Sequence, residues 1–126
     1  MRQENREQIK KSQAILESLK ELRGGTLLEF HKKIANDPSL VDAFMQQYIN
    51  CNKKETTLPR KYRELIIMAL GCAKGTQTTI NTHGRLAREN GATIEEIGEV
   101  LRLVFFLCGA TALIPAAEIF ESLDTD

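Results

Sequence analysis

Apolar residues recur along most of the chain at spacings of three and four, the period of helices that bury one side. Residues 3–22 are rich in helix formers and place Ile15, Leu19 and Leu22 on one stripe. The Gly-Gly pair at 24–25 is expected to end this helix. No segment alternates with period two, so the pattern predicts an all-α protein without a sheet.

Two further helices are expected before residue 51. Thr26 and Glu29 fit a capping box at the start of the first. Its buried side is expected to hold Leu27, Phe30 and Ile34, with His31 at the boundary. Asp37 as N-cap and Pro38 at the first helical position predict a helix that runs to about Asn50.

The segment 51–58 is polar and irregular, and Pro59 then opens a helix that reaches about Ala73. Its stretch 65–70 is apolar on every side, which predicts a central helix surrounded by protein. Gly75 breaks it.

Three more helices complete a predicted fold of about seven. One runs from near Thr76 to just before Gly91, the expected C′ glycine. A second capping box, Thr93 with Glu96, starts a helix over 94–108. Gly109 bends the chain, and a last helix is expected over 111–123, with Pro115 near its first turn.

Composition narrows the class of protein. The chain has 126 residues, of which 42% are hydrophobic and 27% charged, which suits a single compact domain over 1–126. Seventeen basic residues balance seventeen acidic ones, which argues against a general nucleic-acid binder and against attraction to an anionic membrane.

Targeting and redox signals indicate a cytoplasmic protein. The N-terminal segment is polar, so we expect no signal peptide. The longest uncharged run, 103–117, is shorter than the roughly 20 residues of a membrane span. The cysteines, Cys51, Cys72 and Cys108, are widely spaced. They suggest reduced thiols and no metal site.

The candidate chemistry lies between Arg60 and His83. If the helices on either side of Gly75 form an antiparallel hairpin, Glu64 and His83 are offset by three residues, about 4.5 Å along the axis. Their side chains can bridge that distance. A histidine beside a carboxylate is a usual general acid or base.

A small acid could bind next to this pair. Thr76, Thr79 and His83 share one helix face, and the two threonines lie at the helix N-terminus, where free backbone N–H groups attract anions. Lys74 lies just upstream. The alternative is purely structural, with Glu64 as the i,i+4 partner of Arg60, His83 as a boundary residue and Thr76 as an N-cap only.

Several segments resemble the carboxymuconolactone decarboxylases and their alkylhydroperoxidase D relatives. They are the sequence Arg63-Glu64-Leu65-Ile66, then His83, then the stretch 91–101 that reads GATIEEIGEVL, and the glycine-interrupted apolar run 104–117. The resemblance covers about half the chain, residues 58–120, whereas residues 1–57 carry no assigned motif. It implies an all-helical fold that assembles into homotrimers or homohexamers.

The resemblance also implies roles for individual residues, and this chain departs from one branch of the family at two of those positions. The peroxidase branch has a Cys-x-x-Cys pair where this chain has Thr76 and Thr79. Because threonine cannot form a disulfide, we do not expect an alkylhydroperoxidase, although a one-cysteine chemistry through Cys72 is conceivable. The decarboxylase branch keeps only the glutamate and the histidine, which fall on Glu64 and His83.

The decarboxylase interpretation is a cofactor-free lyase that acts on a small lactone or carboxylic acid. His83 would be the acid–base group, Glu64 would orient it, and Thr76 and Thr79 would help to place the substrate. The chain lacks the tyrosine and proline of the branch's Y-A-G-x-P segment, which leaves the substrate open.

Two alternatives to the lyase remain. The first is a non-catalytic homo-oligomer, which a Glu64–His83 pair locked by Arg60 or Arg85 would favour. A solvent-accessible cavity at the pair would favour the enzyme. The second is the peroxidase, which requires turnover that depends on Cys72.

Overall fold

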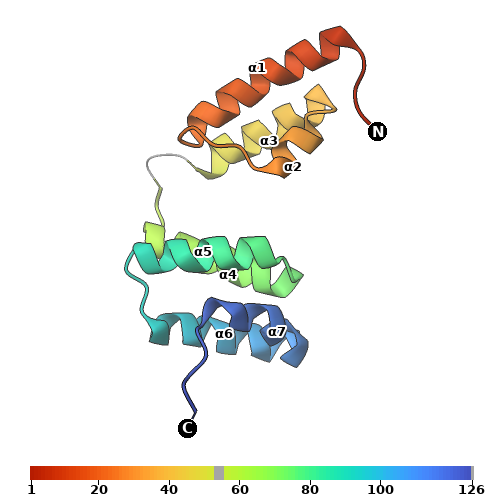
Figure 1. Ribbon diagram of the computed structural model, residues 1–126. Helices are drawn as coiled ribbons and strands as arrows, with labels where there is room; N and C mark the ends of the chain where they lie inside the picture. The colour runs from red at the N-terminus through yellow and green to blue at the C-terminus, as the bar shows by residue number, and fades with distance from the viewer. Residues whose placement is uncertain (53–55, 126) are drawn as a thin grey trace. The chain divides into compact units, whose positions relative to one another are not determined.

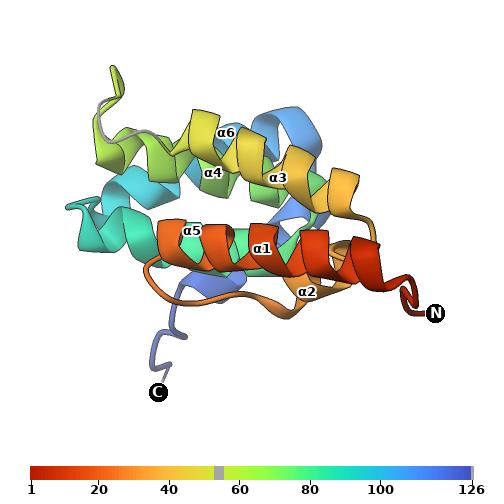
Figure 2. The ribbon, with the colours of Figure 1, turned by 90° about the horizontal axis from the view of Figure 1, so that it is seen from above.

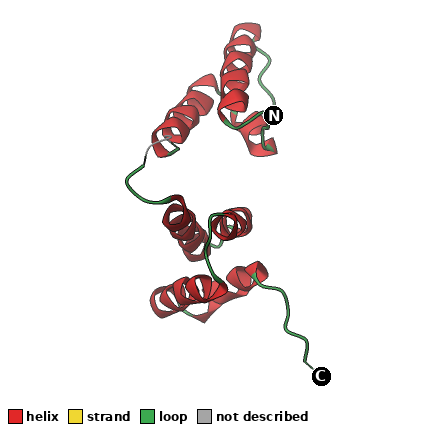
Figure 3. Cartoon of the chain, turned by 90° about the vertical axis from the view of Figure 1, so that its left-hand side faces the viewer, coloured by secondary structure: helices red, strands yellow, loops and turns green. Residues whose placement is uncertain are grey.

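The computed structural model describes residues 1–52 and 56–125, and over these residues it contains helices and no strand (Figure 3). The all-α prediction is confirmed. The chain forms two compact units, Met1–Glu55 and Thr56–Asp126, called here the N-terminal and C-terminal units. The prediction of one domain over 1–126 stays a prediction.

The N-terminal unit contains three helices, α1 (Arg6–Leu22), α2 (Glu29–Ile34) and α3 (Pro38–Cys51). Helix α1 lies along α3 (Figures 1 and 2). The predicted start of α3 is confirmed, because the Asp37 side chain accepts a hydrogen bond from the Ser39 backbone N–H at 3.0 Å.

The capping box predicted at Thr26 is wrong. Helix α2 begins at Glu29, and its N-cap is Leu28. The Leu28 backbone N–H donates to Nδ1 of His31 at 2.9 Å. The ring therefore takes the place that the Glu29 carboxylate was expected to fill.

His31 is fully buried, not at the boundary, whereas Phe30 is 43% exposed. The His31 ring packs against Phe30 and Phe44, with centroids at 4.1 and 5.0 Å. Burial, and then the positive charge of Arg23, lower the pKa of His31 below 6.5. The folded protein therefore keeps this imidazole neutral where the unfolded chain protonates it.

This burial gives a pH dependence of stability. As pH falls from 6.5 toward the lowered pKa of the folded state, the unfolded chain binds a proton at His31 that the folded state does not, so the free energy of unfolding falls. The limiting slope is about 1.4 kcal/mol per pH unit. We expect His31→Gln, which keeps a side-chain acceptor at this cap, to flatten the melting temperature between pH 7 and pH 5 relative to wild type. Equal slopes in the two proteins would contradict a neutral, buried His31.

The C-terminal unit begins with three long helices, α4 (Arg60–Lys74), α5 (Gln77–Glu89) and α6 (Ile94–Cys108). The predicted helix ends are confirmed at Gly75 and Gly91, which have φ of +68° and +94°. The second capping box is also confirmed, because Thr93 and Glu96 bond reciprocally at 2.9 and 3.1 Å. The Glu96 carboxylate also accepts from Lys61 Nζ at 2.8 Å, which ties α6 to α4.

The last predicted helix, 111–123, is wrong in length. The chain instead forms a 3₁₀ turn (Ala110–Ala112), a short helix α7 (Leu113–Ala116) and another 3₁₀ turn (Ala117–Ile119). The Pro115 carbonyl accepts from Gln77 Nε2 of α5 at 2.9 Å. This contact from another helix occupies the carbonyl at the point where the α-helical pattern stops.

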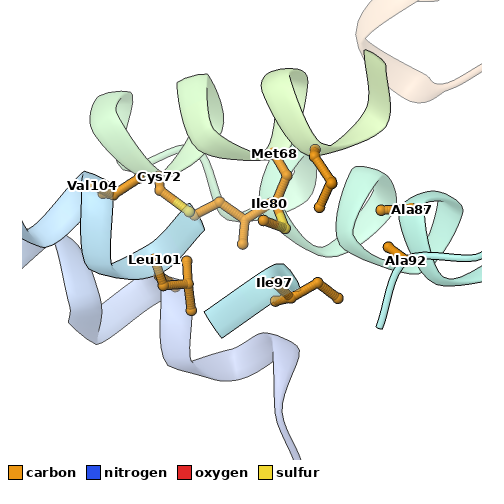
Figure 4. Close-up of a cluster of buried hydrophobic side chains, with 10 residues drawn as sticks. Met68, Cys72, Ile80, Ala87, Ala92, Ile97, Leu101 and Val104 are labelled. Carbon is orange, nitrogen blue, oxygen red and sulfur yellow. The ribbon is translucent and has the colours of Figure 1, made fainter. Parts of the chain in front are cut away.

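Helices α4 and α5 form an antiparallel hairpin, and α6 packs against it (Figure 1). The core fills the space between these helices (Figure 4). Its labelled members are Met68, Cys72, Ile80, Ala87, Ala92, Ile97, Leu101 and Val104. Met68 and Ile80 are fully buried, which fixes the hairpin register that positions the candidate site.

Helix α4 is not surrounded on all sides within the C-terminal unit. Ile66 and Leu70 are 47% and 56% exposed because α5, α6 and α7 cover only the other faces of this helix. An apolar groove of about 460 Å³ lies between α4 and α6. Leu103 and Leu107 line its opposite wall.

Candidate active site

The α4–α5 hairpin brings Glu64 and His83 together, as the three-residue offset predicted. His83 Nδ1 lies 2.5 Å from Glu64 Oε2. The Glu64 side chain is 1% exposed, and the His83 side chain is 26% exposed. The pair is therefore a buried carboxylate that holds a histidine still partly open to solvent.

Arg60, one turn before Glu64 on α4, contacts the other carboxylate oxygen. Its Nε lies 2.6 Å from Glu64 Oε1, and the Arg60 side chain is half exposed. Glu64 thus makes both contacts at once: the ion pair with Arg60 that the structural alternative expected, and the contact with His83. Arg85 contacts Glu89 instead and takes no part in the group.

These contacts define the hydrogen-bond roles of the group. Arginine donates only, so Oε1 of Glu64 accepts from Arg60. A carboxylate held by a guanidinium is an acceptor at its second oxygen as well. His83 therefore donates Nδ1–H to Oε2, and Nε2 is the ring nitrogen with the acid–base lone pair.

Thr76 and Thr79 lie on the same helix but do not bond to the pair within the described residues. Thr76 is the exposed N-cap of α5, and its side chain makes no capping hydrogen bond. Thr79 is half-buried and packs its methyl group toward Gly71 of α4. Thr79 is about 6 Å from His83 along the helix axis, and Thr76 about 10 Å.

Gly71 is the residue of this region that sequence reasoning missed. A Cβ at this position would lie 2.9 Å from Thr79 Cγ2 and 3.2 Å from the backbone N of Ile80. The close approach of α5 to α4 therefore depends on glycine. The sequence did contain a signal for this close approach, because Gly71 lies inside an apolar helical run. Glycine destabilises a helix relative to alanine, so its presence there indicates that packing requires it.

Cys72 is buried, and burial raises the pKa of its thiol. A thiol held in the protonated form is a poor nucleophile toward peroxide. Cys51 and Cys108 are exposed, on α3 and at the end of α6.

Over residues 1–52 and 56–125, no group of three His, Cys, Asp or Glu side chains is placed to hold a metal ion. Within the same ranges, no helix is both long and apolar enough to cross a membrane.

The sequence matches the model of the carboxymuconolactone decarboxylase family over residues 38–122, about two thirds of its length. The chain belongs to this family. The match begins at α3, so it extends further toward the N-terminus than the resemblance over 58–120. An uncharacterized protein of Methanocaldococcus jannaschii is 29% identical over 90 residues, which are 71% of this chain and 74% of that protein.

Two crystal structures share the fold. A provisionally assigned carboxymuconolactone decarboxylase from Burkholderia xenovorans superimposes with a TM-score of 0.71 and 26% identity over 86% of each chain. The alkylhydroperoxidase AhpD core from Rhodospirillum rubrum gives 0.65 and 24% identity, over 97% of this chain and 93% of that one. The predicted fold, an all-α protein of seven α-helices like the alkylhydroperoxidase core, is confirmed for the described part of the chain.

Proposed function

We propose that this protein is a cofactor-free acid–base enzyme that acts on a small lactone or carboxylic acid through His83. The observation that carries this proposal is the contact of a buried Glu64 carboxylate with Nδ1 of a partly exposed histidine. Membership of the carboxymuconolactone decarboxylase family supports it.

The proposed chemistry uses the two ring nitrogens differently. Glu64 holds Nδ1–H and so fixes the ring tautomer and orientation. The lone pair on Nε2 of His83 then takes a proton from the substrate, and the imidazolium so formed returns that proton from Nε2 to the product. Arg60 balances the charge of the buried carboxylate, so Glu64 remains an acceptor throughout.

The N-terminus of α5 supports a substrate that carries a carboxylate. The first-turn N–H groups of a 13-residue helix favour an anion, and the Thr76 hydroxyl makes no capping bond to them within the described chain. A carboxylate bound near Thr79 would place the reacting atom about 6 Å away at His83. This spacing suits a compact molecule with a carboxylate at one end and an acidic C–H bond or an ester at the other.

One observation favours a second candidate, a non-catalytic homo-oligomer of the same family. Arg60 contacts Glu64 directly, which is the locked arrangement expected for a structural pair. Both candidates include self-association, which we propose because Ile66, Leu70, Leu103 and Leu107 are exposed along the α4–α6 groove. The two candidates differ in whether a small acid binds at His83.

A ligand screen by thermal shift separates them. The panel holds small lactones, keto acids and dicarboxylic acids, tested on wild type and on His83→Ala. A ligand present at a hundred times its Kd adds about 2.7 kcal/mol to the free energy of unfolding. We expect at least one compound to raise the melting temperature of wild type and to lose that effect in His83→Ala.

Thr79→Val is the matched control for the anion end of the site, because it keeps the shape and the methyl group toward Gly71 but removes the hydroxyl. It should weaken binding of the same compound without abolishing it. If every stabilising compound acts equally on wild type and His83→Ala, the acid–base site is wrong and the non-catalytic candidate stands.

A further inference from the structure

A second cavity lies in the N-terminal unit, whereas the candidate active site belongs to the C-terminal unit. It has a volume of about 470 Å³ and opens between the N-terminal segment, α1 and α2. Every residue that lines it lies before residue 37, outside the part of the chain that matches the family. The volume lies within the range of about 300–1,000 Å³ typical of small-molecule sites.

The N-terminal segment forms a fixed wall of this cavity. The Gln3 backbone N–H donates to Asn36 Oδ1 at 2.7 Å, and Gln3 Nε2 donates to the Asn36 carbonyl at 3.1 Å. Asn36 in turn donates from Nδ2 to the Lys33 carbonyl at 2.8 Å. These bonds hold the segment before α1 against the end of α2.

Ser12, one of the residues that line the cavity, has a buried hydroxyl without a partner among the described residues. Ser12, on the inner side of α1, is 4% exposed, and its Oγ has no hydrogen bond among the described residues. An unsatisfied buried hydroxyl is costly, and most such groups in proteins have a protein, water or ligand partner. Ile9 and Leu16, one turn to either side on α1, add apolar surface to the same wall.

The charged residues at the rim are mainly basic. Arg2, Lys32 and Lys33 line the cavity together with one acid, Glu29. Glu29 contacts Lys32 at 3.5 Å, so this pair is neutral overall. Within the described chain Arg2 and Lys33 form no ion pair, which leaves an excess of positive charge over a partly apolar floor.

We propose that this cavity binds a small organic carboxylate with an apolar tail. Arg2 and Lys33 bind the carboxylate, Ser12 donates its hydroxyl to it, and Ile9 and Leu16 contact the tail. This site is independent of the chemistry at His83 and would stand if that chemistry failed.

The test titrates the full chain, labelled with ¹⁵N, with octanoate. Two control probes each lack one part of this ligand: 1-octanol has the apolar tail without the carboxylate, and inorganic phosphate has the negative charge without the tail. We expect octanoate to shift the amide signals of cavity residues and to bind at least about tenfold more tightly than either probe, as expected for a hydrogen bond to a charged group. Lys33→Gln should remove most of this advantage over 1-octanol. His83→Ala should leave octanoate binding unchanged.

Ser12→Ala separates a ligand site from a packing defect. Without ligand, this variant should melt at a higher temperature than wild type, because it removes an unsatisfied buried hydroxyl. It should nevertheless bind octanoate several-fold more weakly. Shifts confined to the C-terminal unit, equal binding of phosphate alone, or octanoate affinity unchanged in both Ser12→Ala and Lys33→Gln would each overturn the proposal.

Discussion

Glu64→Gln is expected to keep the fold and to lower the rate of the proposed reaction by about 10²–10⁴-fold, the range for loss of a correctly held acid–base histidine. The reason is that two donors, Arg60 Nε and His83 Nδ1, contact the two oxygens of the Glu64 side chain. Arg60 Nε must still find an acceptor, so the new amide turns its oxygen to Arg60 and its NH₂ to His83. Nδ1 of His83 then accepts, and its proton moves to Nε2.

The tautomer can be measured even before a substrate is known. The chain has two histidines, so long-range ¹H–¹⁵N spectra of the imidazoles report His83 and His31 separately. We expect Nδ1–H at His83 in wild type and Nε2–H in Glu64→Gln. The turnover measurement uses whichever compound the ligand screen identifies.

A second substitution provides the control for this mechanism. Arg60→Met removes the competing donor, so when it is combined with Glu64→Gln the introduced amide is free to turn its oxygen to His83. The double variant should recover the Nδ1–H tautomer and part of the activity. If Glu64→Gln alone keeps Nδ1–H at His83, then Arg60 does not set the orientation of the side chain at position 64, and this mechanism is wrong.

Gly71→Ala is expected to lower the free energy of unfolding by about 1–2 kcal/mol. The new methyl group would overlap Thr79 Cγ2 and crowd the Ile80 backbone, and overpacking of this kind costs about 1–3 kcal/mol. The gain in helix propensity, about 0.5–1 kcal/mol, offsets only part of it. For a unit of this size the expected fall in melting temperature is about 4–16 °C.

Gly98→Ala on α6 is the matched control. Its Cβ would meet only Arg102 Nη1, at 3.6 Å, which is an ordinary contact. Gly98→Ala should therefore raise the melting temperature, because alanine is a better helix former than glycine and nothing crowds its methyl group. Thermal melts followed by circular dichroism compare the two variants with wild type. Equal effects at the two positions would show that α5 does not approach α4 as closely as the structure places it.

Local signals in the sequence determined most of the helix boundaries. Pro38, Pro59, Gly75 and Gly91 restrict the backbone by themselves, and the Thr93–Glu96 capping box is complete within four residues. The Glu64–His83 contact was predictable for a related reason. Once Gly75 turns the chain, helix geometry alone fixes which residues of an antiparallel pair lie at the same level.

Only the tertiary structure decided the features that depend on contacts between helices. His31 is buried because Phe44 of α3 packs over it, and its ring then caps α2 in place of Glu29. The chain leaves α-helical geometry after Ala116, where Gln77 of α5 binds the Pro115 carbonyl. Ile66 and Leu70 are exposed because no other helix of the C-terminal unit covers them. Apolar periodicity shows which residues can be buried, but the choice of partner for each surface depends on how the helices pack.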